Sequence, residues 1–239
     1  MSAVNGSAIS DFLSQLWHRV SATQPAPSST IVLATAGVAA VVVLAPRVWP
    51  VARNAITLVH EASHAGVAVL TGRRLAGIRL RSDTSGLTVS GGRPRGPGMI
   101  ATAAAGYLGP AVLGLGAAWL TSRGHAVAVL WALLLIVVLV ALQIRNWFGL
   151  WSVLVSGAAL VAVTWWATVT WQSATAYALT WFLLLGAPRP VLELVGRRGG
   201  GSDADLLAKL THVPAMAWVV VFGALTIAAA VGGGSLLTP

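Results

Sequence analysis

The 239-residue sequence contains no cysteine, and only 9% of its residues are charged. Without cysteine, neither a disulfide framework nor a thiolate metal site can form. An ordinary soluble domain has about 25% charged residues, so this composition excludes a water-soluble globule. Acidic residues are scarcest, with six Asp and Glu against fifteen Lys and Arg. A basic excess can indicate nucleic-acid binding, but that needs a solvent-facing basic surface on a folded domain. We expect no nucleic-acid partner.

Long apolar stretches dominate what is there. Hydrophobic residues make up 56% of the chain, and its mean hydropathy is +0.81. A helix needs about 20 apolar residues to cross the hydrocarbon core of a bilayer. About seven stretches approach this length, and they lie near residues 30–48, 51–71, 99–121, 126–144, 148–169, 172–188 and 213–232. The sequence therefore predicts an all-α polytopic membrane protein, with residues 1–29 as an amphipathic or flexible lead-in and 30–239 as one membrane-embedded domain.

The basic residues predict the orientation in the membrane. If the seven spans alternate, the N-terminus shares one side with the loops 72–98, 145–147 and 189–212, and that side holds twelve of the fifteen Lys and Arg. Basic loops face the cytoplasm and its anionic lipids. We therefore expect a cytoplasmic N-terminus. A composition rich in Ala, Gly, Val and Arg is typical of a bacterial plasma membrane protein.

One motif carries recognisable chemistry. Residues 60–64 read His-Glu-Ala-Ser-His within the apolar stretch 51–71. Two histidines at positions i and i+4 share one helical face and can bind a single Zn²⁺, while Glu61 beside them can accept a proton from a metal-bound water. The structural alternative is that His60 and His64 bond to neighbouring helices, with Glu61 as their counter-ion. Three ionisable groups within a membrane span are costly, which favours a functional site.

With this motif, the sequence resembles the site-2 protease family of intramembrane zinc metallopeptidases. Members place the zinc-binding helix first in a three-helix core, here 51–169, and follow it with a small β-hairpin and a helix with a Gly-Pro turn. In this chain, residues 76–80 and 86–90 alternate like two strands, and Gly109-Pro110 follows. The resemblance implies a metalloprotease domain with a small cytoplasmic β-hairpin in the loop 72–98.

The third zinc ligand departs from the family pattern. Members carry an Asp-Gly motif in the third core helix, but here the corresponding place offers only Asn146. The resemblance to a divergent branch points instead to Asp203 and Asp205. Placement in the loop 189–212 leaves as candidates Glu193, Asp203, Asp205 and His212. We expect His60, His64 and Asp203 as the metal ligands, with Asp205 as second choice, Asn146 as a polar neighbour, and helix capping as the alternative role of Asp203.

These features together predict an intramembrane zinc metalloendopeptidase with Zn²⁺ as its cofactor and Glu61 as its catalytic residue. Its partners are the lipid bilayer and a membrane-protein substrate, whose transmembrane segment is cleaved near the cytoplasmic side. The hairpin can bind an unwound substrate by strand addition, as the family resemblance suggests. The alternative is a transport or scaffold protein with a buried metal or proton site and no peptidase activity.

Overall fold

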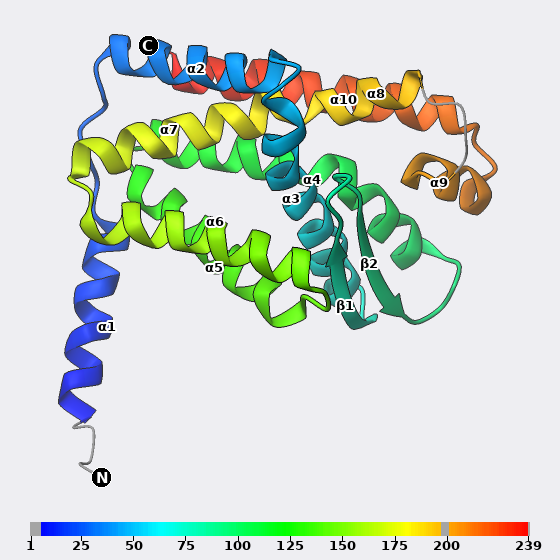
Figure 1. Cartoon of the computed structure of the whole chain (residues 1–239), viewed down its shortest axis with the longest axis horizontal. Helices are drawn as coiled ribbons and strands as arrows, with labels where there is room; N and C mark the ends of the chain where they lie inside the picture. The colour runs from blue at the N-terminus through cyan, green and yellow to red at the C-terminus, as the bar shows by residue number, and fades with distance from the viewer. Residues whose placement is uncertain (1–5, 197–200, 239) are drawn as a thin grey trace.

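The computed structural model describes residues 6–196 and 201–238, which form helices and one antiparallel hairpin (Figure 1). The fold class expected from the sequence is confirmed. The helices and strands are α1 (Gly6–Ser21), α2 (Ser29–Leu44), α3 (Trp49–Leu70), β1 (Arg74–Leu80), β2 (Gly86–Gly91), α4 (Pro97–Ser122), α5 (Ala126–Gln143), α6 (Trp147–Trp166), α7 (Val169–Gly186), α8 (Pro188–Val195), α9 (Asp203–Thr211) and α10 (Ala215–Leu237).

The described residues offer fewer candidate membrane spans than the seven stretches expected. Five helical segments of the described chain are long and apolar enough to cross a membrane, namely α4, α5, α6, α7 with α8, and α10. The helices α2 and α3 qualify only as a pair, which is bent by 101° and raises the count to at most six. Neither helix qualifies by itself, because α2 has only 16 residues and α3 carries the polar residues of the motif.

Two prolines explain the bend between α2 and α3. Pro46 disfavours helical geometry at the residue before it, and Ala45 is extended, with φ −67° and ψ 119°. Pro50 then occupies the first turn of α3, where a missing N–H costs no hydrogen bond. The chain therefore stops one helix and starts the next in a new direction.

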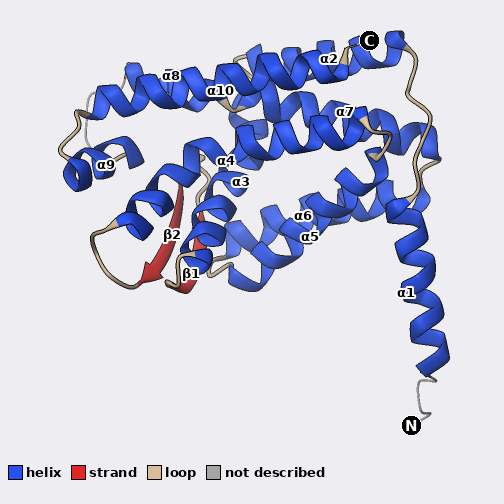
Figure 2. Ribbon diagram, turned by 180° about the vertical axis from the view of Figure 1, so that it is seen from behind, coloured by secondary structure: helices blue, strands red, loops and turns tan. Residues whose placement is uncertain are grey.

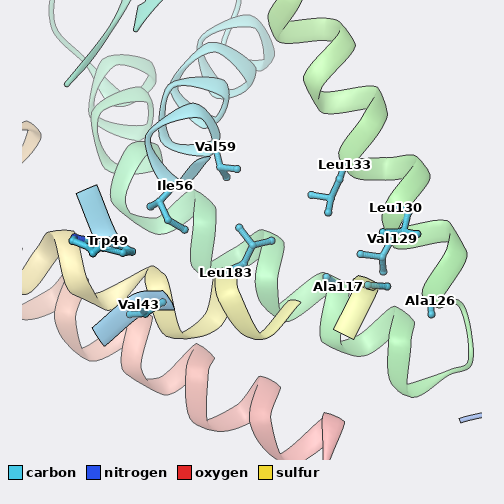
Figure 3. Close-up of a cluster of buried hydrophobic side chains, with 11 residues drawn as sticks. Val43, Trp49, Ile56, Val59, Ala117, Ala126, Val129, Leu130, Leu133 and Leu183 are labelled. Atoms are coloured by element: carbon cyan, nitrogen blue, oxygen red, sulfur yellow. The ribbon is translucent and has the colours of Figure 1, made fainter. Parts of the chain in front are cut away.

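The bundle has two distinct ends. Figures 1 and 2 show the C-terminus and the connection between α1 and α2 at one end, and the hairpin with α9 at the other. A buried cluster ties α3 to the long helices, with Ile56 and Val59 of α3 near Leu183 of α7 and Leu133 of α5 (Figure 3). The start of α3 is thus fixed to the bundle, although α3 runs in a different direction from α2.

The bounds of β1 and β2 agree closely with the two strands expected from the alternation. Ile78 and Leu80 of β1 are buried against Leu58 and Ala65 of α3 and against Val153 of α6. At its turn, Thr57 donates a hydrogen bond from its hydroxyl to the carbonyl oxygen of Thr84, at 2.9 Å. The hairpin is therefore anchored along the side of α3.

The two edges of the hairpin differ. The outer edge of β1 is closed by the connection between α5 and α6, where Ile144 forms a parallel bridge with Ile78. Asn146 completes this closure, because its Nδ2 donates to the carbonyl oxygen of Leu80 at 2.6 Å and its Oδ1 accepts from the N–H of Leu80 at 3.1 Å. The edge of β2 pairs with no further strand of the described residues. The hairpin thus has one closed edge and one open edge.

Replacing Asn146 by Ala is expected to loosen the hairpin. The change leaves the N–H and C=O of buried Leu80 without a partner, at a cost of about 1 to 3 kcal/mol for each group. We expect a lower unfolding temperature in detergent and faster trypsin cleavage after Arg79 and Arg81. The control Asn54→Ala removes an amide that bonds only within the first turn of α3, so it should change neither. Equal proteolysis of both variants would contradict the closing role of Asn146.

Candidate metal centre

Three side chains from distant parts of the sequence converge on one point. His60 and His64 project from α3, and their Nε2 atoms lie 3.0 Å apart. The Oδ2 atom of Asp203, at the start of α9, lies 3.1 Å from Nε2 of His60 and 3.2 Å from Nε2 of His64. Among the described residues these three form a group able to hold a metal ion.

A backbone carbonyl fixes the protonation of His64. Its Nδ1 lies 2.6 Å from the carbonyl oxygen of Thr102 on α4. A carbonyl oxygen only accepts, so Nδ1 carries the proton and donates it. Without a metal, a second proton on Nε2 can bond to Asp203. When that proton leaves, Nε2 presents a lone pair, which is the arrangement that metal-binding histidines adopt.

The donor set fits zinc. With ligand bonds of about 2.0 to 2.1 Å, neighbouring donor atoms of a tetrahedral zinc lie about 3.3 to 3.4 Å apart. The three separations here, 3.0, 3.1 and 3.2 Å, are only slightly shorter. Two imidazoles and one carboxylate leave a fourth position open, as in catalytic zinc sites. Imidazole is a poor ligand for calcium and magnesium, which makes these ions a worse fit.

The two aspartates of α9 have different partners. Ser202 caps the helix and accepts from the N–H of Asp205, while Oδ2 of Asp205 accepts from the N–H of Ser202 at 2.9 Å. This capping box satisfies the first turn without the side chain of Asp203. The sequence left helix capping open as an alternative role of Asp203. The cap is formed instead by Ser202 and Asp205, and Asp203 is the carboxylate that meets the histidines.

The charge of Asp203 follows from its surroundings. Burial raises the pKa of this carboxyl, but hydrogen bonds from His60 and His64 outweigh burial and hold the pKa well below its usual range. The carboxylate is therefore ionised at neutral pH. Asp205 is also ionised, because the hydrogen bonds from Ser202 lower its pKa.

The remaining candidates from the sequence lie elsewhere. Glu193 forms an ion pair with Arg53 at 3.2 Å and accepts from Nε1 of Trp49 at 2.9 Å. His212 ends α9 in a left-handed conformation, with φ 61°. Asn146 bonds to Leu80 and does not line the cavity that contains the histidines. None of these three residues joins the group of His60, His64 and Asp203.

An apolar cluster holds α9 against the bundle. Ala204 and Leu207, one and four residues after Asp203, are buried against Val191 of α8 and Phe222 of α10. Tyr107 of α4 stacks on Phe222 and meets the ring of His60 edge-on, with a centroid separation of 4.9 Å. The same cluster therefore supports both sides of the candidate metal centre.

Several residues of the site escaped sequence reasoning. Gly106 of α4 leaves room for the metal-ligand candidates, because a Cβ there would overlap the rings of His60 and His64. Thr102 contributes only its carbonyl oxygen to His64, which no side-chain pattern can reveal. Thr88 of β2 donates to Oε2 of Glu61 at 2.6 Å. A glycine within an Ala-rich helix was the only signal that the sequence offered.

The site opens into a cavity of about 560 Å³ between α3, β2, α4 and α9. Its wall includes the three metal-ligand candidates, Glu61 and Thr88. Glu61 is only 4% exposed, so its carboxylate is buried at the cavity wall. The arrangement can hold a metal ion, a water molecule and a proton acceptor in one cavity.

Comparison with known proteins agrees with this geometry. The family model described as Peptidase M50B-like matches residues 33–233, which is most of the chain. The chain therefore belongs to this family of peptidases, and the resemblance to site-2 proteases is confirmed. No match was found among curated proteins or among solved structures.

Gly106→Ala is expected to weaken zinc binding without unfolding the protein. The added methyl group would displace both imidazoles, and a misplaced ligand shell should lower zinc affinity by about ten-fold or more. The measurement is zinc per chain after dialysis against a competing chelator. Gly116→Ala is the matched control on the same helix, since a Cβ there meets nothing within 4 Å. Equal zinc retention by both variants would refute the tight packing at Gly106.

Proposed function

We propose that this protein is an intramembrane zinc metalloendopeptidase that cleaves a transmembrane segment of another membrane protein. The observation that carries the proposal is the convergence of His60, His64 and Asp203 at the wall of a cavity that also contains the buried carboxylate of Glu61. The family assignment supports the same class of reaction.

His60, His64 and Asp203 would hold the zinc ion through Nε2, Nε2 and Oδ2. Bound zinc lowers the pKa of a coordinated water to about 7 and polarises a carbonyl group. Thr102 keeps His64 in the tautomer that binding requires. Asp203 brings a negative charge that balances part of the charge of the cation.

Glu61 is the proposed general base and acid. It accepts a proton from the water that attacks the scissile carbonyl, and it delivers that proton to the amine nitrogen as the C–N bond breaks. Its position in the sequence, directly after His60, places it beside the metal ligands on the same helix. Because Glu61 is buried, its carboxylate is shielded from bulk water, which strengthens its interactions.

The cavity lies near one end of the bundle. Thr102 and Gly106, which contact the histidines, are about 8 and 14 Å along α4 from its first residue. Most of the described Lys and Arg residues belong to the hairpin, to the connections beside it or to α9, namely Arg73, Arg74, Arg79, Arg81, Arg93, Arg95, Arg145 and Lys209, whereas Arg19, Arg47, Arg53, Arg123 and Arg189 do not. By the positive-inside rule, this end faces the cytoplasm. Cleavage would therefore occur within the plasma membrane near its cytoplasmic side.

The open edge of β2 is the proposed docking place for the substrate. A helical segment shields its own peptide bonds, so it must unwind before cleavage. An unwound segment can satisfy its backbone groups by adding to an exposed strand. Gly86, Leu87, Thr88 and Ser90 of β2 all line the cavity that holds the metal-ligand candidates. Strand addition there would bring the substrate backbone to Glu61.

The first test separates metal binding from chemistry. Asp203→Asn and His60→Ala are expected to lose the single bound zinc, measured by elemental analysis of purified protein. Glu61→Gln should keep the zinc and lose cleavage by about a thousand-fold, since the amide cannot accept the proton of the attacking water.

Asp205→Asn is the matched control for Asp203→Asn, because the two carboxylates stand two residues apart and Asp205 bonds to the cap of α9. It should keep its zinc and lose only some stability. Undiminished cleavage by a zinc-loaded Glu61→Gln variant would mean that the cleavage does not come from this site, which would reject the peptidase and leave transport or scaffolding. Zinc loss in Asp205→Asn alone would reject Asp203 as ligand.

The second test concerns orientation. If α2 and α3 form one bent span, the chain begins and ends on the side of the membrane opposite the hairpin. We therefore infer an N-terminus outside the cytoplasm, whereas seven spans implied an N-terminus inside it. The chain has no cysteine, so single cysteines can be labelled selectively. In right-side-out vesicles, an impermeant maleimide should label Ser14→Cys at once and Ser82→Cys only after permeabilisation. The reverse order would restore the cytoplasmic N-terminus.

A further inference from the structure

The general base proposed above is held by a strand rather than by its own helix. The hydroxyl of Thr88 lies 2.6 Å from Oε2 of Glu61 and 3.1 Å from the backbone oxygen of the same residue. A hydroxyl has one proton, and the shorter contact is to the ionisable group. A bond from a hydroxyl to a carboxylate at this distance is of the strong, charge-assisted kind.

A second residue of β2 presses on the same side chain. Gly86 precedes Thr88 by two positions, so both lie on the same face of the strand. A Cβ at position 86 would overlap the carboxylate and Cγ of Glu61. The backbone of β2 therefore runs directly against Glu61, and only glycine leaves room for it.

The strand itself is anchored on both sides of this contact. At the turn, Thr84 accepts a hydrogen bond from Nη1 of Arg53 at 3.0 Å and another, through its carbonyl oxygen, from Thr57 at 2.9 Å. Along the opposite edge, Asn146 bonds to Leu80, which pairs with Gly86. Hydrogen bonds on both sides therefore hold the hairpin in a fixed position beside the site.

We infer that Thr88 is a positioning residue for the general base. Its hydroxyl holds Oε2 of Glu61, and Gly86 leaves the room that Oε1 occupies against the strand, so the carboxylate is kept in one orientation for proton transfer. This inference rests on the proposed peptidase function and deepens it. If the substrate adds to the open edge of β2, one rigid strand aligns both the scissile bond and the proton acceptor.

The test compares Thr88→Val with Thr88→Ser. Valine keeps the shape and removes the donor, so kcat should fall by about 10- to 100-fold, the usual cost of losing an outer partner at a metal site. KM, zinc content and unfolding temperature should stay unchanged. Serine restores the hydroxyl and should keep kcat within about three-fold of the original. Thr180→Val, a buried threonine that bonds only within α7, is the control for the substitution itself.

Two further measurements identify the route of the effect. In a Glu61→Gln background, Thr88→Val should cause no additional loss, because both changes act on one group. In the metal-free protein, the infrared carboxylate band that disappears in Glu61→Gln should shift in Thr88→Val.

The outcomes are distinguishable. An unchanged kcat in Thr88→Val, or a serine variant as poor as the valine variant, would overturn the inference while leaving the peptidase intact. If Thr88→Val lost zinc and unfolded at a lower temperature to the same extent as it lost kcat, Thr88 would have a merely structural role. That result would also overturn the inference. Full cleavage by Glu61→Gln would instead overturn the proposed function itself.

Discussion

The meeting of two imidazole nitrogens with one carboxylate oxygen is the constraint on which the candidate metal centre depends. Nitrogen and oxygen atoms 3.0 to 3.2 Å apart stay together only where a shared proton or a cation lies between them. The chain brings them together by several means that have no other evident purpose. Gly106 removes a side chain beneath the rings, Ser202 and Asp205 cap α9 so that Asp203 is free, and the cluster around Phe222 fixes α9 in place.

The bend between α2 and α3 follows from the same requirement. A helix with His60, Glu61 and Arg53 is expensive to place across the centre of a bilayer. Turning it by 101° at the end of α2 leaves these groups near one end of the bundle, where α4, α9 and the hairpin surround them. The apolar helices are the candidate membrane spans, and α3 carries two of the three metal-ligand candidates. As a bent pair, α2 and α3 count as at most one candidate span.

The sequence predicted the parts of the site that depend on local spacing. His60 and His64 share a helical face because they are four residues apart, and the alternation in 76–80 and 86–90 located both strands of the hairpin. Asp203 could be reached only by resemblance and elimination, since 139 residues separate it from His64. Asn146 was misjudged because nothing local reveals that its amide closes the edge of β1. The bend of α3 was missed because hydropathy measures length and not direction.

The contact between His64 and the carbonyl oxygen of Thr102 also bears on how this family can change over time. Its acceptor belongs to the main chain, so every amino acid at position 102 supplies the same atom. A point mutation at position 102 therefore leaves the tautomer of His64 unchanged. Asp203 and Thr88, in contrast, make their contacts through side-chain atoms, which a single substitution removes. The space between α3 and α4 limits which side chains position 102 can carry. The protonation of the His64 ring depends on the backbone and not on that side chain.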